Sequence, residues 1–264
     1  MSELVEKAAD STWFERAARA GQFASGCVHL LIAYIILRLA FGDAGNADQS
    51  GALAIFADSA GGRIALWVAA VVFAALALWR LTEAIVGPHP SEAGDEDSGW
   101  TDRAKALGLV AVYMAFAFST AQFALGQGKS SGQQNAGLSA RLMQSGGGKF
   151  VLVVAGLVIL AVGGYHIFKG ATRRFIDDLK GSPSRLVVVA GVVGYVAKGA
   201  VLAGAGILVI VAAIRADPSK ATGIDGAVKT LAGLPAGQIL LVVAAIGIAT
   251  YGFYSFVMAR YARM

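Results

Sequence analysis

The sequence predicts an all-α integral membrane protein with six transmembrane helices, built as three parallel two-helix repeats in a pseudo-threefold bundle. Three observations predict this fold: the composition, six long apolar segments, and a glycine pattern that occurs three times. Of the 264 residues, 56% are hydrophobic and 15% are charged, whereas about a quarter of the residues of a soluble domain are charged. Lipid is therefore the expected solvent for most of the chain.

Six segments are long and apolar enough to cross a hydrocarbon core about 30 Å thick as helices. They are rich in Ala, Leu, Val and Ile, and they lack the alternation of polar and apolar residues that is typical of membrane barrel strands. The predicted transmembrane helices cover residues 22–41, 64–81, 106–125, 150–168, 190–214 and 239–258.

A pair of glycines leads into the second, fourth and sixth of these helices. The two glycines lie eleven residues apart in every pair, which indicates three copies of a two-helix unit within a single membrane domain over 1–264. The pairs are Gly51 and Gly62, Gly137 and Gly148, and Gly226 and Gly237. The copies cover about 17–87, 103–174 and 185–260, and an acidic linker over 88–102 joins the first two.

Each copy crosses the membrane twice, so all three copies enter it from the same side as parallel repeats. Thirteen Lys and Arg residues lie on the side that holds both termini, eight lie on the opposite side, and Lys198 lies inside an apolar segment. By the positive-inside rule, we expect both termini and the acidic linker to face the cytoplasm. The bases gather at the ends of apolar runs, so they indicate membrane interfaces and no nucleic-acid partner.

The residues of the repeat also carry a resemblance to other proteins. The stretches involved are Ala20-Gly21-Gln22-Phe23 in the first helix, Leu78-Trp79-Arg80-Leu81 in the second, and Gly194-Tyr195-Val196-Ala197-Lys198-Gly199 in the fifth. They resemble domain of unknown function 1206, a family of bacterial membrane proteins, over nearly the whole chain. The resemblance implies three tandem two-helix units in a bacterial inner membrane, and it implies no activity because none is assigned to the family.

The second copy departs from the repeat pattern at two adjacent positions. It has Val112 where the third copy has Lys198, and it has Tyr113 where the other two copies have Gly26 and Gly199. Threefold equivalence is therefore broken at this point, and we expect any site there to be asymmetric.

Two histidines, His29 and His166, lie in the first and fourth apolar segments. Two imidazoles at a similar depth could ligate a haem. Because no repeated partner motif accompanies them, we favour hydrogen bonding inside the bundle or to headgroups, with haem binding as the alternative. The single cysteine, Cys27, excludes an intrachain disulfide and a thiolate metal cluster, and the sequence predicts no metal site.

Other polar residues lie near the ends of the predicted helices. The repeat places Arg80, His166 and Ser255 at equivalent positions. Such a ring either lines a central cavity or marks the level at which three helices leave the hydrocarbon, and the second interpretation is favoured. Lys198 lies in an unusually long segment, and snorkelling to the cytoplasmic side is favoured over a buried cation. The apolar segments lack Asp and Glu, which argues against a proton relay of carboxylates.

The sequence lacks the nucleophile-elbow, phosphate-loop and zinc-protease motifs, so it predicts no catalytic residue and no enzyme activity. The leading interpretation is an accessory, assembly or scaffold subunit that lies in the lipid bilayer and binds another membrane protein or complex, because the extensive small-residue faces suit helix packing. The alternatives are a small-molecule or ion transporter or channel along the pseudo-threefold axis and, less favoured, a haem-binding electron carrier.

Overall fold

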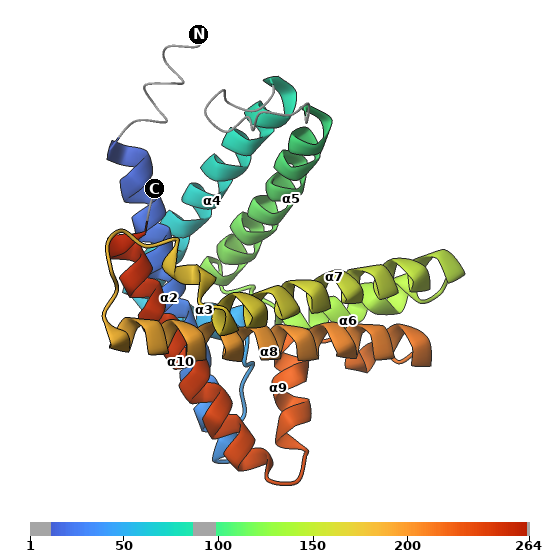
Figure 1. The fold of residues 1–264 in the computed structure, drawn as a ribbon. Helices are drawn as coiled ribbons and strands as arrows, with labels where there is room; N and C mark the ends of the chain where they lie inside the picture. The colour runs from blue at the N-terminus through green and yellow to red at the C-terminus, as the bar shows by residue number, and fades with distance from the viewer. Residues whose placement is uncertain (1–11, 87–98, 263–264) are drawn as a thin grey trace. The chain divides into compact units, whose positions relative to one another are not determined.

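The computed structural model describes residues 12–86 and 99–262, which form helices joined by short loops (Figure 1). The predicted all-α fold is confirmed, and six long helices are apolar enough to cross a membrane. These helices are α2 (Thr12–Ala40), α4 (Ala60–Val86), α5 (Gly99–Ala124), α7 (Gly146–Ala171), α8 (Arg185–Arg215) and α10 (Gly237–Tyr261). The predicted linker over 88–102 falls largely outside the described residues, since α5 begins at Gly99.

Each copy also has a short helix in the loop between its two long helices. These are α3 (Gln49–Ala57), α6 (Ser131–Leu142) and α9 (Ile224–Ala232). We call them the cap helices, and we call the ends of the long helices next to them the cap side. Two 3-10 turns, η1 (Arg174–Ile176) and η2 (Pro218–Lys220), flank α8.

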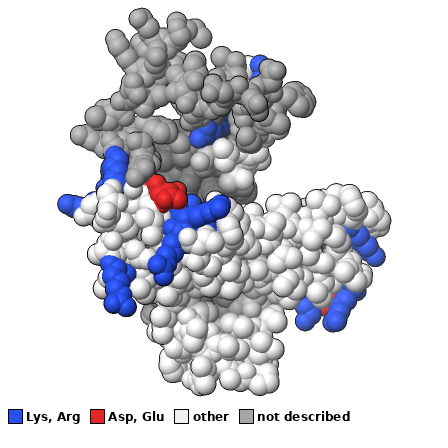
Figure 2. Space-filling view, in the orientation of Figure 1, with Lys and Arg blue, Asp and Glu red and all other residues white. Residues whose placement is uncertain are grey.

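Many large apolar side chains of the long helices are exposed on the surface of the protein. In the most apolar 18-residue window of each long helix, between 17% and 44% of the residues are buried. Val71, Phe150 and Ile239 expose 66%, 70% and 65% of their surface. Apolar surfaces this large are rare on soluble proteins, but lipid tails cover them in a multi-pass membrane protein. Figure 2 shows long uncharged stretches between small groups of Lys and Arg on the visible face.

The long helices pack as three antiparallel pairs: α4 with α5, α7 with α8, and α10 with α2 (Figure 1). The chain divides into two compact units, of which Leu53–Lys129 holds the first pair, and Met1–Ala52 with Ser130–Met264 holds the other two. In the larger unit, α10 also packs against α8. In every pair, the second long helix of one copy contacts the first long helix of the next. The pairing is cyclic, because the third copy pairs with the first.

Glycines spaced seven residues apart hold α7 against α8. Gly156 and Gly163 on α7 face Gly206 and Gly199 on α8. A β-carbon at Gly163 would lie 2.5 Å from the backbone nitrogen of Ala203, and one at Gly199 would lie 2.6 Å from the carbonyl oxygen of Gly163. Small residues let helices approach this closely in lipid, where no hydrophobic force drives helices together. The glycine-rich faces of this pair are therefore used inside the protein.

The α2/α10 pair repeats the same contact. A β-carbon at Gly26 would lie 2.9 Å from the carbonyl oxygen of Gly252, and the reverse distance is 3.0 Å. Gly252 and Gly163 occupy equivalent positions, since each follows the second glycine of its repeated pair, Gly237 or Gly148, by fifteen residues. The α7/α8 and α2/α10 pairs therefore have the same glycine contact at equivalent positions of the repeat.

The α4/α5 pair replaces this contact with larger side chains. Ala77 stands at the position of Gly163 and Gly252, and Tyr113 stands where the other first helices have glycine. Tyr113 stacks on Phe73 of α4 with ring centroids 6.4 Å apart, while Ala77 is buried. The departure of the second copy from the repeat pattern therefore reflects a pair that packs through aromatic rings.

The second glycine of each repeated pair is required by the cap helix before it. A β-carbon at Gly62, Gly148 or Gly237 would lie 1.9, 1.9 or 2.1 Å from a carbonyl oxygen in the last turn of the preceding cap helix. No other residue type avoids that clash without moving the backbone. The close approach of each cap helix to the next long helix explains why glycine recurs at this position.

Candidate functional site

The two candidate haem ligands lie at opposite ends of a row of aromatic rings. The ring centroid of His166 on α7 lies 5.8 Å from that of Tyr195 on α8, which lies 5.4 Å from that of Tyr251 on α10. Tyr251 in turn lies 4.7 Å from His29 on α2. Two tyrosine rings therefore separate the imidazoles, and a haem held by both histidines would have to displace these rings.

Each histidine is also hydrogen-bonded to its own helix. Nδ1 of His29 lies 2.7 Å from the carbonyl oxygen of Ser25, and Nδ1 of His166 lies 2.9 Å from that of Val162. Because a carbonyl only accepts, Nδ1 carries a proton in both rings, and in a neutral ring Nε2 is left as an acceptor. The imidazoles are thus oriented by the backbone one turn before them.

The three residues of the predicted polar ring have different surroundings. Ser255 is fully buried and donates to the carbonyl oxygen of Tyr251 on the same helix. His166 belongs to the aromatic row, and Arg80 belongs to the smaller unit with α4 and α5. The surroundings of Ser255 are those of a helix interface rather than of a cavity.

Lys198 points across the interface from α8 to α10. Its Nζ donates to the hydroxyl of Tyr251 at 3.0 Å and lies 4.2 Å from the centroid of the same ring. A cation in this position is attracted by the negative face of the ring. Together with His29, Lys198 lines a small cavity of about 50 Å³. The rest of the lining is apolar and consists of Ile32, Ile36, Val201, Leu202, Ile224 and Ile248.

The N-termini of the three cap helices meet within the larger unit. The hydroxyl oxygen of Ser50 in α3 accepts a hydrogen bond of 3.0 Å from the backbone N–H of Ser131 in α6. The carboxylate of Asp225 in α9 accepts one of 2.8 Å from the backbone N–H of Ala47, just before α3. The bonded residues are 81 and 178 positions apart in the sequence. Two hydrogen bonds therefore join the loops of all three copies.

Asp48 caps the N-terminus of α3. Its Oδ1 accepts hydrogen bonds from the backbone N–H groups of Ser50 and Gly51, at 2.8 and 3.2 Å, and from the hydroxyl of Ser50 at 2.5 Å. A carboxylate is favourable at this end of a helix, where N–H groups are unpaired and the helix dipole is positive. Within the described residues, its buried Oδ2 makes no hydrogen bond.

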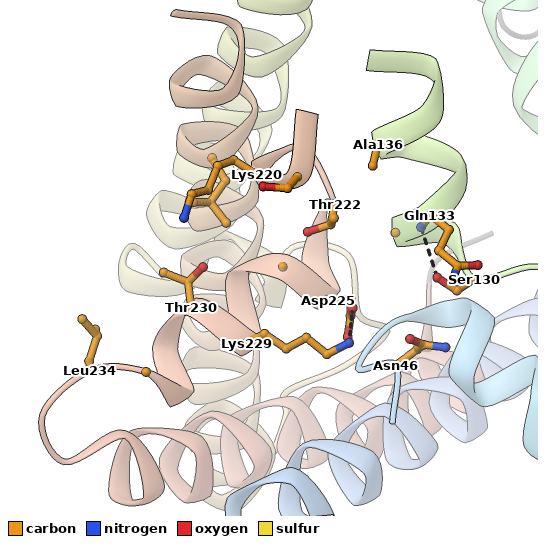
Figure 3. Close-up of a pocket in the computed structure, with 15 residues that line it drawn as sticks. Asn46, Ser130, Gln133, Ala136, Lys220, Thr222, Asp225, Lys229, Thr230 and Leu234 are labelled. Atoms are coloured by element: carbon orange, nitrogen blue, oxygen red, sulfur yellow. Dashed lines mark hydrogen bonds and ion pairs between the residues drawn. The ribbon is translucent and has the colours of Figure 1, made fainter. Parts of the chain in front are cut away.

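An open cavity of about 800 Å³ lies between α6, α9 and η2, and every copy contributes to it (Figure 3). The first copy contributes Asn46, and the third contributes the lining residues from Leu208 onward. The second contributes Ser130, Gly132, Gln133 and Ala136. Figure 3 shows Lys229 reaching toward Asp225, with Gln133 on α6 and Ser130 just before α6 across the cavity. The other labelled polar residues are Lys220, Thr222 and Thr230.

One carboxylate and two ammonium groups line this cavity. Asp225 is 4% exposed, and its Oδ2 lies 2.7 Å from Nζ of Lys229, four residues later on α9. Lys220 in η2 supplies the second ammonium. Asp217, just before η2, accepts hydrogen bonds from the hydroxyl and backbone N–H of Ser219, which hold the pKa of its carboxyl below the usual range. A solute in the cavity would meet an excess of positive charge together with hydroxyl and amide groups.

Sequence reasoning did not single out Asp48, Asp225 or the cavity beside them. One signal was present, because Asp225 stands at a repeat position that is held by Ser50 in the first copy and Ala136 in the second. An acid that interrupts a repeat inside a short apolar helix marks a position with a special partner. That partner, the backbone of the loop before α3, belongs to another copy.

The sequence profile of Domain of Unknown Function 1206 matches the chain three times, over residues 20–87, 104–173 and 193–262. The chain belongs to this family. The three matches of the DUF1206 profile correspond to the three copies predicted from the glycine spacing.

One relative of this chain is the uncharacterized protein YxxB of Bacillus subtilis strain 168. The two sequences are 27% identical over 259 residues, which cover 96% of this chain and 92% of the relative. No solved structure matches. The family and this relative therefore support the repeat architecture of a DUF1206 protein and give it no activity.

Proposed function

We propose that this DUF1206 protein binds a polar solute in the cavity between α6, α9 and η2, and that it serves in the transport of that solute. The observation that carries the proposal is the cavity itself, whose volume of about 800 Å³ lies within the range of small-molecule sites. Residues of all three copies of the repeat line it, so no single copy can form it.

The chemistry of the lining indicates the class of solute. The Asp225–Lys229 ion pair, the ammonium of Lys220 and several hydroxyl and amide groups offer both donors and acceptors. A zwitterionic or hydroxylated molecule, such as an amino acid or a sugar, matches this combination better than an apolar one. We infer from the distribution of Lys and Arg that the cap side faces away from the cytoplasm, so the solute arrives from outside.

The packing of the glycines weakens the interpretation as an accessory subunit. That interpretation expected small-residue faces turned outward toward a partner, whereas Gly156, Gly163, Gly199 and Gly206 face one another inside the α7/α8 pair. We also propose a non-enzymatic role. The carboxylate that lines the cavity, Asp225, is engaged by Lys229 and by the N–H of Ala47, which makes it a poor general base.

The test is a comparison of two tryptophan variants in lipid nanodiscs. Thr230→Trp places a large ring in the cavity, and Leu138→Trp, on an exposed position of α6 outside the lining, is the matched control. Thermal unfolding is measured with a panel of amino acids and sugars, and native mass spectrometry records retained molecules. We expect at least one solute to stabilise the wild type and the control but not Thr230→Trp.

Two results would contradict this proposal. One is a wild type that neither retains a small molecule nor responds to any member of the panel. The other is a stoichiometric protein partner retained from the native membrane, which would restore the accessory role instead.

A further inference from the structure

Three departures from the internal repeat come together between α2, α8 and α10. Lys198, His29 and Tyr251 are polar, whereas the other copies have mostly apolar residues at the matching positions. Those residues are Ser25 and Val112 for Lys198, Phe116 and Leu202 for His29, and Leu76 and Val162 for Tyr251. The repeat is an internal control: a helix pair of this family packs without these polar groups, so packing alone does not require them.

The three side chains contact one another although they come from three helices. Tyr251 is at the centre, with Nζ of Lys198 at 3.0 Å from its hydroxyl and the ring of His29 at 4.7 Å from its ring. His29 and Lys198 both line the cavity of about 50 Å³. A cavity of this size holds a few water molecules or one small ion.

Lys198 lies far from both ends of α8. It follows Arg185 by thirteen residues and precedes Arg215 by seventeen, which correspond to about 20 and 25 Å of helix at 1.5 Å per residue. Within the described part of the chain, its ammonium contacts the ring and hydroxyl of Tyr251 and forms no ion pair with a carboxylate. A charge at such a position is costly unless a counter-ion accompanies it.

The polar side chains that line the small cavity are Lys198 and His29, and the hydroxyl of Tyr251 lies beside the ammonium of Lys198. Nζ of Lys198 uses one of its three N–H bonds on the oxygen of Tyr251, so two remain. The hydroxyl of Tyr251 accepts that bond and is free to donate its own proton. A site with an ammonium, a phenol donor and apolar walls suits an anion and disfavours a cation.

We propose that Lys198 and Tyr251, with His29 beside them, hold one small monovalent anion in the membrane-spanning part of the protein. This site is distinct from the cavity that binds the polar solute and does not depend on that proposal. Ile224, the first residue of α9, closes the small cavity, while Asp225 next to it lines the large one. The two sites are therefore separated by the first turn of α9.

The test uses chloride as the probe and the full-length protein in nanodiscs. Thermal unfolding is measured at increasing sodium chloride, with the ionic strength kept constant by sodium gluconate, whose anion is too large for the cavity. We expect chloride to stabilise the wild type saturably and to act at least tenfold more weakly on Lys198→Met. Tyr251→Phe keeps the ring but loses the donor, and we expect about tenfold weaker binding.

Three controls make the result decisive. Lys149→Met removes an exposed ammonium at the start of α7 and should keep the full chloride response. Thr230→Trp should also keep it, since the large cavity is elsewhere. In gluconate alone, Lys198→Met should unfold at the same or a higher temperature than the wild type, because a half-buried charge without a carboxylate partner has been removed. This last measurement also shows that the variant folds.

The proposal is overturned by a wild type that does not respond to chloride, or by a response that Lys198→Met retains in full. Loss of the response in Thr230→Trp would place the ion in the large cavity and would overturn it as well. Broadening of the chloride-35 NMR signal by the wild type, and its loss with Lys198→Met, provides a second measurement that is independent of stability.

Discussion

At the scale of single residues, neighbouring glycines differ in what a side chain would meet. A β-carbon at Gly148 would lie 1.9 Å from the carbonyl oxygen of Leu142, whereas a β-carbon at Gly147 would have no described atom within 4 Å. The same contrast separates Gly163, which faces α8, from Gly164. A glycine is therefore needed for close packing only where its α-carbon faces a neighbouring segment, however many other glycines the helix contains.

Asp217 provides a prediction about pH at the residue scale. Its hydrogen bonds from Ser219 lower the pKa of the carboxyl in the folded protein. A group with a lowered pKa stabilises the fold above its unfolded pKa, and this contribution is lost as the pH falls through the folded value. We expect Ser219→Ala to raise the pKa of Asp217 toward its ordinary range, and Ser219→Thr, which keeps a hydroxyl, to leave it low.

This shift can be followed by NMR titration of the Asp217 carboxyl carbon. The Ser219→Ala variant should also lose less order around η2 than the wild type between neutral and acidic pH. An Asp217 pKa that is the same in wild type and Ser219→Ala would show that the hydroxyl is not the cause.

At the scale of elements, the α7/α8 pair depends on close backbone contact. We expect Gly163→Val to destabilise the folded protein by about 1–3 kcal/mol, because the side chain would be forced against the backbone of Ala203. Gly164→Val introduces the same residue one position later on an open face and should change stability by less than about 0.5 kcal/mol. Reversible unfolding in mild detergent measures both. Equal effects would mean that valine acts through helix propensity alone.

The six long helices and the three copies could be predicted from the sequence, because both follow from local patterns. Runs of apolar residues mark helices in lipid, and the spacing of Gly51 and Gly62 recurs twice. The partner of each helix could not be predicted. A glycine such as Gly199 indicates that some backbone comes close, but not that it is Gly163 from the preceding copy.

The candidate sites were predictable only in part. His29 and Lys198 stood out as ionisable groups in apolar segments, yet the length of α8 left the depth of Lys198 open, and its contact with Tyr251 joins two helices. The large cavity beside α6 and α9 depends on hydrogen bonds between loops of different copies, such as that from Ala47 to Asp225. No local pattern in a sequence records such a pairing.

At the scale of the whole molecule, the α2/α10 pair closes the cycle of helix pairs. The rings of Phe23 and Phe256 lie 5.0 Å apart in this pair. In a Cys27→Ser background, Phe23→Cys with Phe256→Cys should therefore be joined by a short bismaleimide in the native membrane. Phe23→Cys with Ile246→Cys should not be joined, because Ile246 lies ten residues before Phe256, or about 15 Å away along α10. Linkage of both pairs with equal efficiency would contradict the register of α2 and α10 in the structure.

The pairing of α2 with α10 has a consequence for biosynthesis. Among the six long helices that the structure describes, α2 is translated before the others and α10 after them, so α2 has no pairing partner until α10 has been made. A chain that stops before α10 leaves Gly26 without the close backbone contact that Gly252 provides. Because the cycle has no natural beginning, a circular permutant that starts with the second copy should build the same three pairs from a different order of insertion.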